Sequence, residues 1–144
     1  MAAVGGLPRD CVGSWIQGFS VNISKVSILL AESWGCRKGL KLCKKLGVTH
    51  LIIEMDSQVD VNAICSGIDM DNHAAVLVAD IRRSLLAFAS CTVQHILREG
   101  NSAADFLASV GYSLPMGTSR FAQPAARVED ILLADRLGVP FMRP

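Results

Sequence analysis

Glu32 and Asp56 carry carboxylates at positions where a catalytic or metal-binding group would be expected. At about 100° per residue, Glu32 falls within roughly 40° of Cys36, Leu40 and Cys43, so it heads the buried face of one helix. Asp56 directly follows a short apolar run that is typical of a buried strand. Ligands of open α/β sheets bind outside the carboxyl ends of strands. If the two acids converge, they predict a catalytic or metal-binding site.

The elements that must position these acids are a long helix, a strand and a short helix. Ser27 is the expected N-cap of the long helix and Gly47 its expected C-cap, with one arginine and four lysines on the face opposite Glu32. Residues 49–53 are predicted to form the buried strand. Ser57 is placed to cap the short helix, which is expected to end at Gly67.

The rest of the chain predicts a hairpin before the long helix and a helix, a strand and a helix after the short one. The expected strands are residues 4–9, 15–23 and 92–97. The expected helices are residues 73–88 and the segment capped by Asn101. The inward positions of the first of these helices are Val76, Leu77, Ile81, Leu85 and Phe88. This order predicts a mixed α/β layer fold.

The chain divides by composition into three parts. Residues 1–111 are predicted to form the domain, and residues 112–126, rich in Pro, Gly, Ser and Gln, an extended connector. Residues 127–144 are predicted to form a tail with a short amphipathic helix that stops at Gly138 and Pro140. This helix is expected to dock on the domain or on a partner.

Composition excludes several classes of protein. The chain is 51% hydrophobic with a net charge of +1, so neither disorder nor a general affinity for polyanions is indicated. Its five cysteines contain no C-x-x-C pair, which argues against a disulfide framework and a zinc site. No segment resembles a membrane span or a secretory signal. We therefore expect a soluble, intracellular protein, with nucleus and cytoplasm both open.

Four short motifs resemble one family. They are Ala31-Glu32 on a helix, Glu54-Met55-Asp56-Ser57 at a strand end, the run from Arg98 to Asp105 opening a helix, and Gly5 to Asp10 in the hairpin. Together they resemble the type 1 ribonuclease H domain, in the plant reverse-transcriptase-like form found in retrotransposon-derived proteins. The motifs occur in the family's order, and the likeness extends over nearly the whole chain.

The resemblance implies a ribonuclease H-like fold, a mixed β-sheet flanked by helices. It also implies four carboxylates that hold two Mg²⁺ ions and cleave the RNA strand of RNA/DNA hybrids. Glu32, Asp56 and Asp105 match three of these carboxylates. The family's first acid lies on a central strand before the hairpin, and this sequence contains no match to that strand. Two strand edges are then expected to lack a partner.

Other residues near these motifs allow more than one interpretation. Arg98 and Asn101, near Asp105, are expected to touch a phosphate backbone. The lysines of the long helix form either a nucleic-acid-binding strip or, as we expect, a solvated face. Trp34 either stacks on a base or, more in keeping with its place, fills the core. His95, within a predicted strand, is interpreted as structural.

Three functions therefore stay open. The first is Mg²⁺-dependent endonucleolytic cleavage of RNA in RNA/DNA hybrids by Glu32, Asp56 and Asp105. The second is a catalytically inactive module that binds nucleic acid or a protein. The third is a retrotransposon-derived remnant whose open sheet edge promotes association.

Overall fold

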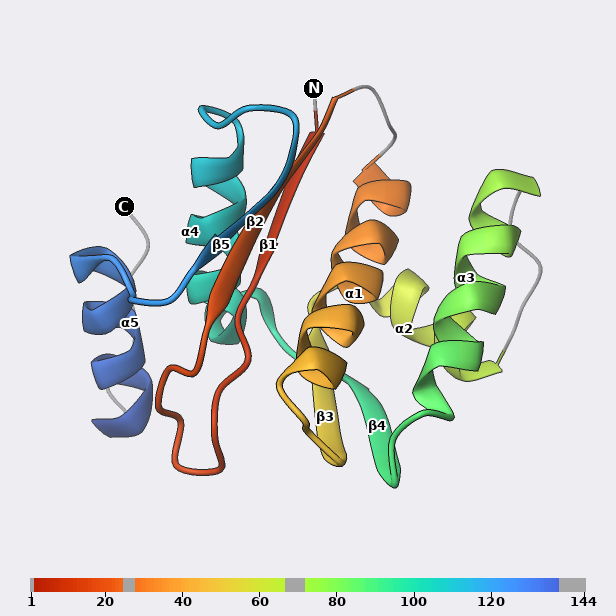
Figure 1. Ribbon diagram of the computed structural model, residues 1–144, viewed down its shortest axis with the longest axis horizontal. Helices are drawn as coiled ribbons and strands as arrows, with labels where there is room; N and C mark the ends of the chain where they lie inside the picture. Colours follow the sequence, from red (N-terminus) through yellow and green to blue (C-terminus); the bar gives the residue numbers. More distant parts are fainter. Residues whose placement is uncertain (1, 25–27, 67–71, 138–144) are drawn as a thin grey trace. The chain divides into compact units, whose positions relative to one another are not determined.

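The computed structural model describes residues 2–24, 28–66 and 72–137 (Figure 1). The chain divides into two compact units, which are described one at a time. The hairpin unit is Met1–Lys25 together with Arg98–Pro144, and the parallel-sheet unit is Val26–Leu97. The predicted cap Ser27 and the predicted helix stops Gly67, Gly138 and Pro140 lie outside the described residues.

The hairpin unit contains an antiparallel sheet of three strands. β1 (Ala2–Gly6) pairs with β2 (Gly18–Ser24), which confirms the predicted hairpin with shifted ends, and β2 pairs on its other side with β5 (Gly117–Phe121). The turn is held by Asp10, whose Oδ1 accepts hydrogen bonds from the N–H groups of Val12 and Ser14. Gly13 has φ +85° in this turn, a conformation that favours glycine.

Helix α4 (Ser102–Gly111) packs closely on β1. A Cβ atom at Gly5 would lie 2.4 Å from the backbone nitrogen of Ala108, so only glycine permits this approach. The buried hydroxyl of Ser20 donates a hydrogen bond of 2.5 Å to the carbonyl oxygen of Leu107. These contacts fix the register of α4 on the hairpin.

The predicted connector contains a strand that its composition did not predict. β5 lies within residues 112–126, and just after it the carbonyl of Ala122 accepts a hydrogen bond from Trp15 Nε1 at 2.9 Å. The following helix, α5 (Ala126–Leu137), packs against α4 in the same unit. The core between the two helices consists of Ala103, Leu107, Val128, Ile131 and Leu132. The amphipathic helix therefore docks on its own chain, while the proposed division into domain, connector and tail stays a prediction.

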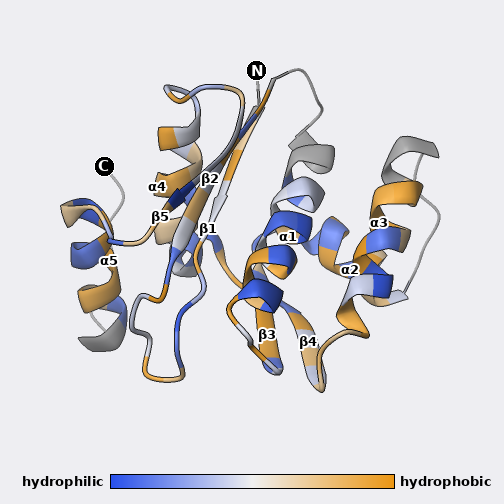
Figure 2. Cartoon of the chain, in the orientation of Figure 1, coloured by the Kyte–Doolittle hydropathy of each residue, from blue (hydrophilic) through white to orange (hydrophobic). Residues whose placement is uncertain are grey.

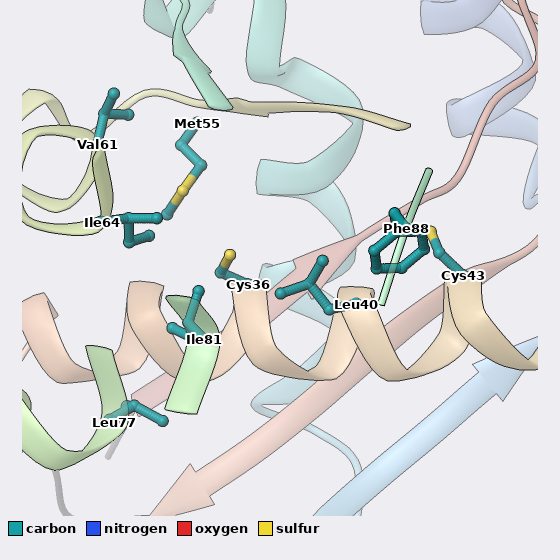
Figure 3. Packing of buried hydrophobic residues seen from close by; sticks show 9 residues of the cluster. All are labelled: Cys36, Leu40, Cys43, Met55, Val61, Ile64, Leu77, Ile81 and Phe88. Carbon is teal, nitrogen blue, oxygen red and sulfur yellow. The ribbon is translucent and has the colours of Figure 1, made fainter. Parts of the chain in front are cut away.

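The described residues of the parallel-sheet unit form two strands and three helices. In chain order they are α1 (Ile28–Lys45), β3 (His50–Met55), α2 (Gln58–Ser66), α3 (Asn72–Leu85) and β4 (Ser90–His95). β3 and β4 pair in parallel from His50 opposite Ser90 to Met55 opposite His95. Figure 3 shows the core of this unit, in which nine buried side chains meet: Cys36, Leu40, Cys43, Met55, Val61, Ile64, Leu77, Ile81 and Phe88.

Helix α1 confirms the predicted buried stripe. Cys36, Leu40 and Cys43 are buried, and burial, with smaller effects of Cys91 and Asp60, raises the pKa of the Cys36 thiol to about 12. These cysteines act as small apolar residues of the core. In Figure 2 the coloured turns of this helix carry hydrophilic segments beside hydrophobic ones. α1 ends as predicted, because Gly47 at φ +76° lets the N–H groups of residues 47 and 48 bond back to the carbonyls of residues 44 and 43.

Arg37, on the basic face of α1, contacts two other side chains: its Nε lies 2.7 Å from Asp80 Oδ2 and its guanidinium lies 5.2 Å from the ring centre of Trp34. One detail of the predicted faces is wrong. On α3, Val76 is 73% exposed and Val78 takes its place in the core. Residues 77, 78 and 81 lie on one side of a helix of 3.6 residues per turn, which leaves Val76 on the rim. Trp34 is half-buried against the core, as expected.

The described strands form two separate sheets, a mixed α/β architecture as predicted. Within the described residues, β1 is hydrogen-bonded to β2 alone and β3 to β4 alone. Each sheet thus has an edge strand where the resemblance implies a further strand. No helix in the described part of the chain has the length and hydropathy needed to cross a bilayer.

Candidate carboxylate site

Asp56 directly follows β3, at the edge where the carboxyl ends of both parallel strands meet. Its side chain is half-buried. Its backbone carbonyl accepts a hydrogen bond of 3.2 Å from Nε2 of His95, the last residue of β4. His95 therefore carries a proton on Nε2 and ties β4 to the residue after β3, which agrees with its predicted structural role.

Ser57 caps α2, as predicted. Its Oγ accepts a hydrogen bond of 3.3 Å from the N–H of Asp60, and its carbonyl accepts one of 3.0 Å from the N–H of Val61. A serine in this position satisfies donors that the helix itself leaves unpaired. The cap fixes the direction in which the chain leaves Asp56.

Glu32 lies on α1 and is half-buried. The next residue, Ser33, is almost completely buried at 1% exposure. Cys36, one turn further on, belongs to the core of the parallel-sheet unit. Glu32 therefore heads the buried stripe of α1, as its helical phase predicted.

Asp60 is an acid of this region that the sequence interpretation missed. It is 0% exposed, and its Oδ1 accepts a hydrogen bond of 3.3 Å from Ser33 Oγ. Oδ2 has no hydrogen-bond partner among the described residues. Burial raises the pKa of Asp60; hydrogen bonds from Ser57 and Ser33 lower it, and the nearby charge of Asp56 raises it further. The missed signal is spacing, because Asp60 stands four residues before the buried Ile64 on α2.

The third predicted carboxylate, Asp105, lies in the first turn of α4 in the hairpin unit. A 3₁₀ turn, η1 (Arg98–Asn101), leads into this helix. Asn101 occupies the N-cap position but makes no side-chain capping bond, so its predicted capping role is wrong. The 3₁₀ turn η1 directly precedes the helix. Arg98 Nε lies 3.8 Å from Asp105 Oδ2, an exposed ion pair.

The predicted site residues thus come from both units. Glu32 and Asp56 belong to the parallel-sheet unit, where their neighbours Ser33 and Ser57 both bond to Asp60. Asp105, Arg98 and Asn101 belong to the hairpin unit. No group of three or more His, Cys, Asp or Glu side chains able to share a metal ion occurs within residues 2–24, 28–66 and 72–137.

The donor set nevertheless fits magnesium in kind. Glu32 and Asp56 offer carboxylate oxygens, and both are partly accessible. Mg²⁺ is commonly held by one or two carboxylates together with waters and substrate phosphates, so it does not need a closed protein cage. Two carboxylates of one unit therefore suit a magnesium ion that binds with a phosphodiester.

Comparison with known proteins decides the family. The family described as reverse transcriptase-like matches residues 1–111. The chain belongs to the reverse transcriptase-like family. A protein of Arabidopsis thaliana whose name provisionally assigns it to ribonuclease H is 34% identical over 138 residues, which are 96% of this chain and 22% of that protein. The chain thus spans about a fifth of the length of this relative.

Solved structures agree on the fold. Ribonuclease H1 of the halophilic archaeon Halobacterium salinarum is similar with a TM-score of 0.73 at 20% identity, covering 77% of this chain and 85% of that one. A ribonuclease H1 isolated from compost is similar with a TM-score of 0.72 at 20% identity, covering 77% and 84%. The chain has the mixed α/β fold of these ribonuclease H1 structures, as its motifs predicted.

Proposed function

We propose that this domain binds RNA/DNA hybrids and hydrolyses their RNA strand with the help of Mg²⁺, using Glu32, Asp56 and Asp105. The observation that carries the proposal is the surroundings of Asp56. Its backbone is held by His95, its chain direction is set by the Ser57 cap, and Ser57 is linked through Asp60 to the neighbour of Glu32. Membership of a family with ribonuclease H relatives supplies the reaction class.

Each residue has a defined role in the proposal. Glu32, Asp56 and Asp105 would hold Mg²⁺ through their carboxylate oxygens. When bound, Mg²⁺ lowers the pKa of a coordinated water and stabilises the charge on the leaving oxygen of a phosphodiester. Arg98 and Asn101 would bind the phosphate backbone, which supplies most of the affinity for nucleic acids.

Carboxylates that share a metal site repel one another while no cation is bound. Two carboxylates about 5 Å apart repel by roughly 3 kcal/mol at an effective dielectric constant of 20. The ion pair with Arg98 partly neutralises the charge of Asp105. We expect Arg98 to exchange Asp105 for a phosphate when a hybrid binds.

The test is cleavage of an RNA/DNA hybrid by residues 1–144 in Mg²⁺. We expect cleavage that stops with EDTA and that falls by about a hundredfold or more in Asp56→Asn, because loss of a metal ligand costs more than the 10- to 100-fold typical of outer partners. The matched control is Asp130→Asn, an exposed acid of α5, which should cleave like the wild type. Equal cleavage by wild type and Asp56→Asn would remove Asp56 from the mechanism.

A second candidate is a module that binds nucleic acid without cleaving it. It is favoured by the absence of a three-ligand metal group in the described chain and by the pairing of Arg98 with Asp105. Under this proposal the hybrid binds with equal affinity to wild type and Asp56→Asn, and no product forms in Mg²⁺ or Mn²⁺. A gel-shift measurement beside the cleavage assay separates the two candidates.

A further inference from the structure

Asp60 is the most completely buried acid among the described residues, and its burial is costly. The side chain is 0% exposed, and one of its two oxygens has no hydrogen-bond partner within the described chain. An unsatisfied buried polar group costs about 1 to 3 kcal/mol. Such a residue calls for a physical explanation.

The packing of α2 does not require a carboxyl group at this position. The neighbouring side chains on the same helix, Val61, Ala63 and Ile64, are buried and apolar. An apolar side chain of similar volume would fill the same space without an unsatisfied oxygen. Replacing both partners of a buried hydrogen bond by apolar groups of the same shape is often neutral or stabilising.

The hydrogen bonds of Asp60 supply the explanation, because they join two elements. Ser33 Oγ on α1 donates to Asp60 Oδ1 at 3.3 Å. The backbone N–H of Asp60 donates to Oγ of Ser57, the cap of α2, at 3.3 Å. One buried residue therefore bridges α1 and the start of α2, through its carboxyl group on one side and its backbone on the other.

The two ends of this bridge stand beside the two candidate metal ligands. Ser33 directly follows Glu32, and Ser57 directly follows Asp56. Adjacent Cα atoms are about 3.8 Å apart, so a shift of either serine moves the neighbouring acid with it. All five residues lie in the parallel-sheet unit.

We propose that Asp60 is a positioning residue that, through Ser33 and Ser57, holds Glu32 and Asp56 at the separation required for a shared divalent cation. The inference rests on the proposed function. Asp60 itself does not bind the cation. Outer groups that orient the ligands of a metal typically change its affinity by about 10- to 100-fold when they are removed.

The test is the affinity of residues 1–144 for Mn²⁺, used in place of Mg²⁺ and measured by isothermal titration calorimetry beside the melting temperature. Asp60→Val keeps the apolar packing and removes the bond to Ser33, the α1 end of the bridge. It should raise the Kd for Mn²⁺ by about tenfold or more, while the buried Ser33 hydroxyl that loses its acceptor lowers the melting temperature. Asp60→Asn retains an acceptor for Ser33, so its Kd should stay within about twofold of the wild type.

Two further variants separate positioning from stability. Ile64→Val creates a small cavity in the same helix without touching the bridge, so it should lower the melting temperature and leave the Kd unchanged. Ser33→Ala removes only the α1 end of the bridge and should raise the Kd in the same direction as Asp60→Val. Ser33→Ala also provides the answer if Asp60→Val does not fold.

The outcomes distinguish this inference from the proposed function. If Asp56→Asn weakens Mn²⁺ binding while Asp60→Val and Ser33→Ala bind like the wild type, the positioning role is wrong and the proposed site stands. If Ile64→Val raises the Kd as much as Asp60→Val, the effect reflects stability alone and overturns the inference. If the wild type does not bind Mn²⁺, the proposed metal site is wrong, and the inference falls with it.

Discussion

The two units hold their candidate acids in different ways. In the parallel-sheet unit, Asp56 and Glu32 stand beside a buried bridge of Ser33, Asp60 and Ser57, set into an otherwise apolar core. In the hairpin unit, the hydrophobic cluster between α4 and α5 includes no acid, and Asp105 forms an exposed ion pair of 3.8 Å with Arg98. One region positions its acids by buried hydrogen bonds, and the other by an exposed charge.

This difference has energetic consequences. Substituting or protonating a buried polar group changes the free energy of unfolding strongly, because an unpaired polar group or charge is costly in the low dielectric of the interior. Exposed ion pairs contribute about 0 to 1 kcal/mol and weaken with salt. We therefore expect the parallel-sheet unit to respond to pH and packing and the hairpin unit to respond to ionic strength.

The largest expected effect tests whether each unit has its own core. Ile81 is 0% exposed in the parallel-sheet unit and Ile131 is 2% exposed in the hairpin unit. Either change to alanine should cost about 2 to 5 kcal/mol. Ile81→Ala should accelerate hydrogen exchange mainly in α1 and α3, and Ile131→Ala mainly in α4 and α5. Exchange that accelerates equally across both units in both variants would break the comparison.

The next effect is the pH dependence contributed by Asp60. Burial raises its pKa in the folded state above the ordinary value of 3.8, so the folded protein binds more protons than the unfolded chain between these two pKa values. Stability therefore falls as pH rises through this window. The advantage of Asp60→Asn over wild type should be small near pH 3.8 and should grow toward pH 7.

The measurement is the free energy of unfolding of both proteins in urea, in buffer with EDTA, across this pH range. Titrating groups that do not interact with Asp60 contribute equally to both proteins, so the difference reports Asp60 together with its coupling to Asp56. If the difference in free energy of unfolding between the two proteins stays constant with pH, or shrinks toward pH 7, the pKa of Asp60 is not raised in the folded state.

The smallest effect on stability is expected at Arg98. Its side chain is 70% exposed, so Arg98→Gln should change the free energy of unfolding by about 1 kcal/mol or less. If Arg98 contacts a phosphate, the slope of log K for hybrid binding against log salt should become shallower by about 0.9. Lys45→Gln, an exposed change at the end of α1, is the matched control and should leave that slope unchanged. An equal slope in wild type and Arg98→Gln would remove Arg98 from the interface.

The sequence predicted the elements whose signals are local. The strand before Asp56 and the Ser57 cap follow from a short apolar run and a serine at its end. The buried stripe of α1 follows from the helical period, and its end follows from Gly47. These features depend on nearest neighbours along the chain, which the sequence displays directly.

The missed features depend on contacts between distant residues. Asp60 was overlooked because an acid in the first turn of a helix is usually solvated, and only the serine of another helix accounts for its burial. β5 was overlooked because its segment is rich in Gly, Ser and Pro, and its partner β2 lies about a hundred residues earlier. Asn101 resembled a cap, but the 3₁₀ turn before it already leads into the helix.

The most direct test of the account is a crystal structure of residues 1–144 with Mn²⁺, with the ion located by anomalous scattering. The account predicts a peak within about 2.0 to 2.3 Å of carboxylate oxygens of both Glu32 and Asp56, close to the ideal distances for Mg²⁺. Carboxyl groups of Glu32 and Asp56 more than about 12 Å apart, beyond any ion pair of the two-metal kind, with no peak at either, would contradict it.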